Sequence, residues 1–142
     1  MQHHSYIIRK ELIQKEGNKS MNKRQRKKWL KRQGLYVNPK ETWSLDYTIA
    51  KFVLPRLEYF KRVNNGYPGH DEMDTPEKWD AALDKMINSF RIIVSSDGDY
   101  AYGLDRDDYL DRQSYLEAID AKTTEIQEGL MLFAKWYQHL WW

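Results

Sequence analysis

The residues with the clearest chemical potential lie in one short basic segment. Eight Lys and Arg residues stand between residues 19 and 32, and no acid stands among them. Cations at this density are typical of surfaces that neutralise nucleic-acid phosphates, and a Trp among them can stack on a base. We therefore predict nucleic-acid contacts by Lys23, Arg24, Arg26, Lys27, Lys28, Trp29, Lys31 and Arg32. The alternative is a solvated tail, or a helix whose charges pair with the acidic half of the same chain.

Acidic residues gather in a second segment, residues 97–112, beside glycines and tyrosines. Oxygen-rich clusters suit calcium or magnesium, but an EF-hand loop starting at Asp97 would need an oxygen ligand and a glycine where Ala101 and Tyr102 stand. We expect no metal there. Two interpretations remain open: a solvated loop, or a surface that imitates phosphates and occupies a basic groove on a partner. The second interpretation predicts partner contacts by Asp97, Asp99, Asp105, Asp107 and Asp108.

No arrangement typical of a catalytic centre is visible in the sequence. The chain has no cysteine, which excludes disulfides, thiolate zinc sites and cysteine nucleophiles. Its four histidines include no pair at the i, i+4 spacing of a helical metal site. Neither a nucleophile elbow nor a glycine-rich phosphate loop with its lysine occurs. We therefore expect a protein that is not an enzyme, with no catalytic residue, no metal and no cofactor.

The last seven residues, WYQHLWW, form an unusually aromatic chain end. Trp and Tyr are enriched at interaction hot spots, so this end could anchor a partner. We favour a structural role for most of it. In that role Trp136, Tyr137, Leu140 and Trp141 close the core against the helix that begins near Trp79. Trp142 is then the residue expected to stay exposed and to contact a partner.

Helical periodicity marks the elements that must position these segments. Apolar residues recur at helical spacing in three stretches, residues 45–63, 79–94 and 116–140. Pro55 predicts a kink or a break in the first, because it lacks a backbone donor. The second has the strongest start signal, Thr75 as N-cap followed by Pro76. In the third, apolar positions from Leu116 to Leu140 alternate at spacings of three and four, the seam of a helix packed along its length.

These stretches predict an all-α fold, a small bundle of three to four helices with an acidic loop before the last one. The core is expected around Trp79, Leu83, Phe90, Ile126, Leu130 and Phe133. We expect residues 1–34 to form a basic N-terminal arm, partly helical or disordered, and residues 35–142 to form the helical domain. Met21 resembles a translation start, so residues 1–20 are expected to be an extension.

Charge is divided sharply along the chain although the net charge is only +2. Residues 1–70 hold 16 Lys and Arg against 5 Asp and Glu, whereas residues 71–128 hold 6 against 16. Such asymmetry suggests a charged partner. No apolar run reaches the roughly 18–20 residues that cross a bilayer, and no secretory signal is visible. We therefore expect a cytoplasmic protein with no membrane partner.

Three stretches of the chain resemble small proteins encoded by phages and prophages of Gram-positive bacteria. They are W-S-L-D-Y-T-I-A-K-F-V-L-P-R-L (Trp43–Leu57), N-N-G-Y-P (Asn64–Pro68) and G-L-M-L-F-A-K-W-Y-Q-H-L-W (Gly129–Trp141). The resemblance spans residues 43–141 with gaps and carries over no functional residue. It implies that the chain works in the cytoplasm of a bacterial host cell. Small phage proteins often bind host machinery there, and inhibitors of defence nucleases, including anti-CRISPR proteins, are one such class.

Charge and context together point to three functions. The first is a non-catalytic phage accessory protein that binds and inhibits a host nucleoprotein, such as a CRISPR-type defence nuclease. Its basic segment would meet RNA or DNA while its acidic surface meets the partner's basic channel. The second is a nucleic-acid-binding protein that acts directly through residues 19–32. The third is a phage assembly component that uses the aromatic C-terminus.

Overall fold

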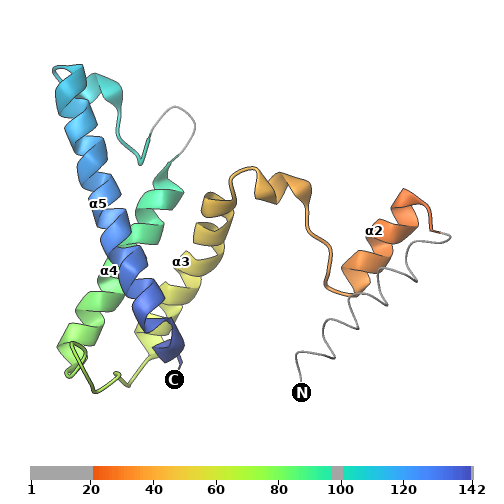
Figure 1. The fold of residues 1–142 in the computed structure, drawn as a ribbon, viewed down its shortest axis with the longest axis horizontal. Helices are drawn as coiled ribbons and strands as arrows, with labels where there is room; N and C mark the ends of the chain where they lie inside the picture. The colour runs from red at the N-terminus through yellow and green to blue at the C-terminus, as the bar shows by residue number, and fades with distance from the viewer. Residues whose placement is uncertain (1–20, 97–100, 142) are drawn as a thin grey trace. The chain divides into compact units, whose positions relative to one another are not determined.

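The chain folds into helices joined by loops. A computed structural model describes residues 21–96 and 101–141. In these residues the regular elements are the α-helices α2 (Lys23–Arg32), α3 (Leu45–Val63), α4 (Pro76–Ser95) and α5 (Arg112–Trp136), and the short 3-10 helices η1 (Pro39–Thr42), η2 (Arg106–Asp108) and η3 (Tyr137–His139) (Figure 1). The described residues contain isolated bridge pairs but no strand. The predicted all-α fold is confirmed.

The described residues form two compact units, which meet between Glu41 and Thr42. The first unit contains α2. The second, the helical domain, contains α3, α4 and α5, and within it α4 packs against both α3 and α5 (Figure 1). None of the helices in the described residues is long and apolar enough to span a membrane.

The core of the helical domain lies along α4, as the periodicity predicts. Trp79, Leu83 and Phe90 of α4 are almost completely buried, and Ile126 of α5 is also buried. Phe133 of α5 is half-buried and meets Phe90 edge to face, with ring centroids 5.1 Å apart. Burial of such side chains stabilises a fold by roughly 1.5–3 kcal/mol each. The predicted core is therefore confirmed, with Leu130 also half-buried against it.

The helices α4 and α5 approach each other closely at Ser89 and Gly129. Ser89 is completely buried, and its hydroxyl donates to the backbone oxygen of Ile126 at 2.8 Å. A β-carbon built on Gly129 would overlap the Ser89 hydroxyl and the backbone oxygen of Lys85. Only glycine therefore fits at this crossing. The residue has no conformational role here, since it lies inside a regular helix.

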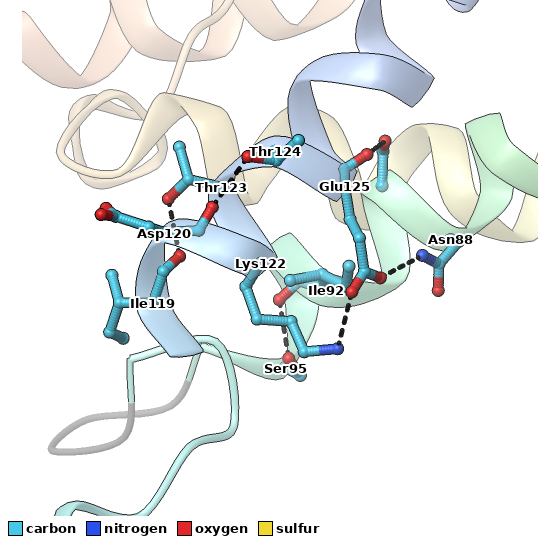
Figure 2. Close-up of polar contacts among 10 residues, drawn as sticks. Asn88, Ile92, Ser95, Ile119, Asp120, Lys122, Thr123, Thr124 and Glu125 are labelled. Atoms are coloured by element: carbon cyan, nitrogen blue, oxygen red, sulfur yellow. Dashed lines mark hydrogen bonds and ion pairs between the residues drawn. The ribbon is translucent and has the colours of Figure 1, made fainter. Parts of the chain in front are cut away.

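Beside this crossing, polar side chains link the same two helices. Asn88 of α4 donates to the Glu125 carboxylate of α5 at 2.9 Å, and Lys122 approaches the other carboxylate oxygen at 3.3 Å (Figure 2). These bonds, from Asn88 first and then from Lys122, lower the pKa of Glu125. The carboxylate is therefore held charged at the edge of the core, where it bonds side chains from both helices.

Pro55 does not break α3, so of the two outcomes predicted from the sequence, a kink or a break, the break is wrong. The helix assignment runs without interruption from Leu45 to Val63, with Pro55 inside it. Proline has no backbone N–H, so Pro55 cannot donate to the carbonyl of Lys51 four residues earlier. Because Pro55 is exposed, this carbonyl can accept from water instead. Ala50 and Leu57, on either side of it, are buried in the core. Packing of these two turns against the core holds the helix together across the proline.

The aromatic end of the chain is only partly in the core. Helix α5 ends at Trp136, which is buried and meets Trp79 edge to face. The chain then continues as the 3-10 helix η3, which has fewer residues per turn than an α-helix. The side chains after Trp136 therefore leave the face predicted to pack against the core. Tyr137 is 63% exposed and Trp141 73% exposed, so their predicted burial is wrong, whereas Leu140 is half-buried against the core.

The close crossing at Gly129 yields a stability prediction. Gly129→Ala should lower the free energy of unfolding by about 1–3 kcal/mol, because overpacking pushes α4 and α5 apart. Helix propensity alone would raise the stability of the Ala variant by about 1 kcal/mol. A decrease in the free energy of unfolding would therefore come from packing and not from helix propensity. Urea unfolding followed by circular dichroism measures it.

Gly66→Ala is the matched control for this substitution. Its β-carbon would meet no atom within 4 Å, so the same chemical change should leave stability nearly unaltered. Equal stability of Gly129→Ala and the unmodified protein would contradict the role given to the crossing.

Candidate nucleic-acid interface

The predicted nucleic-acid-binding residues lie on α2, a helix with well-formed ends. Asn22 caps it by accepting from the Gln25 backbone at 2.9 Å, and the Gln25 side chain bonds back to the Asn22 backbone at 2.9 Å. At the other end Gly34 has a positive φ of 66°, and the backbone N–H of Leu35 donates to Leu30 at 2.9 Å. These reciprocal caps satisfy backbone groups at both ends of a helix that buries none of its residues.

The cations of α2 are all exposed and gather mainly on one side of the helix. Helical spacing places them in two adjacent rows, which we call the basic face: Lys23, Lys27 and Lys31, and beside them Arg24, Lys28 and Arg32. Arg26 and the half-buried Trp29 lie on the neighbouring side. The predicted residues are therefore brought onto one short helix, with the aromatic ring next to the basic face and not within it.

Residues 21–41, the described part of the first unit, offer the basic face few acids. Like charges four residues apart on a helix repel each other, typically by about 0.2–0.5 kcal/mol per pair. Glu41 is the only acid in residues 21–41. The first turn of α2 also carries cations and no acid, against the preference of a helix N-terminus for negative charge. A polyanion bound along this face would relieve both effects.

Tyr36 belongs to the basic face although the sequence analysis missed it. The chain reverses at Gly34, and this turn brings the Tyr36 ring under the lysine row. Lys27 Nζ and Lys31 Nζ lie 5.2 and 5.3 Å from the centre of the ring, within cation–π range. The signal available in the sequence was Gly34 followed two residues later by an aromatic side chain.

The predicted acidic surface is divided between structural and exposed residues. Asp97 and Asp99 lie outside the described residues. Asp105 caps η2 by accepting from the Asp107 backbone at 2.9 Å, so it has a local structural role. Asp107 and Asp108 are exposed on η2. The described residues contain no group of three or more side chains suited to hold a metal ion.

Acids of the helical domain pair with cations of the same domain. Lys61 of α3 bonds Asp84 of α4 at 2.6 Å and lies 3.4 Å from Asp80, and its hydrogen bond with Asp84 raises the pKa of the lysine. Arg91 of α4 meets Glu58 of α3 at 2.7 Å. Each such exposed pair stabilises the fold by about 0–1 kcal/mol. Together these pairs place opposite charges of α3 and α4 next to one another.

The aromatic chain end offers a smaller candidate surface. Trp142, predicted to contact a partner, lies outside the described residues. Trp141 is largely exposed, and so is Tyr137 on η3. The predicted role of this end in assembly therefore stays a prediction.

Comparison with known proteins assigns no role to the interface. No family model, no curated protein and no solved structure matches the chain. The resemblance of residues 43–141 to phage proteins therefore stays a prediction. What α2 does has to be argued from its own charges and geometry.

Asp111, at the end of the acidic segment, yields a pH-dependent prediction. Its carboxylate caps α5 by accepting from the Ser114 backbone at 2.8 Å, and this bond is the main cause of its lowered pKa. A carboxylate whose pKa is lowered by folding stabilises the fold fully at pH values above its pKa in the unfolded chain. This stabilisation is lost as the pH falls through its pKa in the folded chain. Asp111→Ala should therefore lower Tm by a few degrees at pH 7, and the difference should narrow as the pH falls below about 4.

Asp108→Ala is the control for this measurement. Asp108 lies in the same segment and is exposed, so its removal should change Tm little at either pH. The capping role would be contradicted if the Tm of Asp111→Ala differed from that of the unmodified protein by the same amount at every pH.

Proposed function

We propose that this chain is a non-catalytic nucleic-acid-binding protein and that the basic face of α2 is its binding surface. The observation that carries the proposal is the set of six exposed cations in two adjacent rows, within a described stretch, residues 21–41, that holds one acid. Such a helix gains most from an extended anion. A nucleic-acid backbone supplies phosphates in series, and their neutralisation releases condensed counterions.

The chemistry of the face favours phosphates over base edges. Lysine provides a point charge without a fixed hydrogen-bonding plane, and four of the seven cations of α2 are lysines. The half-buried ring of Trp29 and the ring of Tyr36 could each stack on an unpaired base. Binding is therefore expected to depend strongly on salt and weakly on sequence, with single strands accepted readily.

The resemblance to phage proteins supplies the setting of the proposal. In that setting the chain works in the cytoplasm of an infected bacterium, on nucleic acid of the phage or of the host. The helical domain then acts as a stable body that carries the arm. The proposal gives the helical domain no catalytic role, and the polar residues described above cap its helices or bridge them.

A salt titration tests the binding surface. Fluorescence anisotropy with labelled single-stranded and duplex oligonucleotides should give affinities that fall steeply with salt. Lys27→Ala, Lys28→Ala and Lys31→Ala together remove three phosphate contacts. The slope of log K against log salt should therefore decrease by about 2 to 3 in magnitude.

The control changes the net charge equally but in the helical domain. Lys51, Lys78 and Lys85 are exposed there, and the latter two pair with acids at 2.7 and 3.5 Å. Their combined replacement by Ala should leave the salt slope unchanged. Equal losses in the two triple variants would show an effect of net charge alone, and binding that is insensitive to salt would contradict the proposal outright.

A second candidate function is inhibition of a host nucleoprotein, such as a CRISPR-type defence nuclease. The observation that favours it is a patch on the acidic loop, where exposed Asp107 and Asp108 are followed by a fully exposed Leu110. A large apolar side chain beside two carboxylates suits the basic channel of a protein better than it suits nucleic acid. The basic face of α2 would then meet the nucleic acid of the same complex.

Capture from a bacterial lysate treated with nuclease separates the two candidates. A nuclease inhibitor should retain one protein, and Asp107→Asn with Asp108→Asn should lose that protein. Asp74→Asn with Glu117→Gln removes two exposed acids elsewhere in the domain and should not. Recovery of proteins only while nucleic acid is intact would eliminate the second candidate and support the first.

A further inference from the structure

Two histidines that are distant in the sequence meet at the end of the helical domain. His70 lies in the loop before α4, and His139 lies in η3 after α5. Their Nε2 atoms are 3.2 Å apart, and their ring centroids are 5.1 Å apart with the planes inclined at 60°. The Trp136 ring packs against both of them, at 5.5 Å from His70 and 5.2 Å from His139. Two imidazole nitrogens therefore converge on one point.

The loop that carries His70 is held in place from two sides. Residues 70–73 form a tight turn in which the Met73 backbone donates to His70 at 3.1 Å, and the Met73 side chain is buried in the core. Glu72 bonds Lys135 of α5 at 2.7 Å, and this bond lowers the pKa of Glu72. The loop is thus fastened beside the end of α5, from which η3 continues. The separation of the two rings is set by these contacts before any ligand arrives.

Asp71 determines which nitrogen of His70 carries the proton. Its carboxylate oxygen Oδ2 lies 2.8 Å from Nδ1 of His70, so a neutral ring keeps its proton on Nδ1. The lone pair is then on Nε2, which faces His139. Nδ1 of His139 is buried without a hydrogen-bond partner in the described residues, so in the metal-free pair Nε2 of His139 donates to the lone pair on Nε2 of His70 at 3.2 Å. A metal ion would take the place of that proton, which moves to Nδ1 of His139 when both Nε2 atoms act as ligands.

We propose that His70 and His139 form a two-nitrogen chelating site for a divalent transition-metal ion of the zinc, nickel or copper type. Metal–imidazole bonds of about 2.0–2.1 Å separate two ligand nitrogens by about 3.3 Å at a tetrahedral angle and about 3.0 Å at a right angle. The observed 3.2 Å lies between these values. A carboxylate on the far nitrogen of a ligating histidine is the usual outer partner that orients the ring and raises its basicity, and Asp71 occupies that place.

A cavity adjoins one of the two rings. It has a volume of about 280 Å³ and is lined by His139 together with residues 64–68, Trp79 and Trp141. Water occupies about 30 Å³ per molecule, so a further metal ligand on the His139 side could be water or a group from a partner. Imidazole ligands suit late transition metals, whereas calcium and magnesium require oxygen ligands. Binding would tie the loop before α4 to the end of α5.

Isothermal titration with zinc chloride and nickel chloride tests the site. The chain carries two more histidines, His3 and His4, so the reference protein has both replaced by Ala. This reference should bind one ion per chain, and calcium should not compete. His70→Ala and His139→Ala, added singly, should each weaken binding at least tenfold, since each removes one arm of the chelate. Asp71→Asn should weaken it by about tenfold or more.

A control variant and a folding measurement separate loss of the site from loss of the fold. Asp74→Asn removes a nearby acid that pairs with Lys78 and not with a histidine, so it should leave the affinity unchanged. Circular dichroism of each variant without metal shows whether it is folded, and a rise in Tm of the reference with zinc gives an independent reading. Absence of binding by the reference, or loss in only one of the two histidine variants, would overturn the proposal. An equal effect of Asp71→Asn and Asp74→Asn would remove the role given to Asp71.

Discussion

The architecture of the helical domain depends on the close crossing of α4 and α5 at Ser89 and Gly129. Because a glycine faces a serine, the two backbones approach until the Ser89 hydroxyl reaches a backbone oxygen of α5. The same two helices also bring Phe90 against Phe133 and Trp79 against Trp136. A larger side chain at the crossing would separate these rings. Interiors are close-packed, so one local contact of this kind determines where its neighbours can pack.

Electrostatics divides the chain into two parts with different requirements. In the helical domain, Lys61 and Arg91 join α3 to α4 through acids of the facing helix, so much of its charge is matched internally. The described part of the first unit, residues 21–41, places a single acid, Glu41, in the same stretch as the basic face of α2. The caps at Asn22 and Gly34 stabilise α2 and so oppose the repulsion between the cations on its surface. The proposed nucleic-acid partner would supply negative charge to this surface.

The two proposed sites differ in how they are built. The basic face is made within one helix, and its cations are displayed in order by helical spacing alone. The histidine pair is made by His70 in the loop before α4 and His139 in η3 after α5. It depends on the turn at residues 70–73, which the buried Met73 side chain and the Glu72–Lys135 ion pair hold in place. The first site therefore survives small changes in helix packing. The second depends on them directly.

Local patterns in the sequence determined the helices, their strongest start at Thr75 and Pro76, most of the core and the density of charge on α2. These features depend on residues within about four positions of each other, so spacing alone encodes them. The tertiary structure decided what depends on the packing of distant segments. It kept α3 continuous through Pro55, exposed Tyr137 and Trp141, turned Tyr36 under the lysine row and joined histidines 69 residues apart. The physical reason is that the angle and closeness of packed helices, determined here at Gly129, are not encoded in any short stretch of the chain.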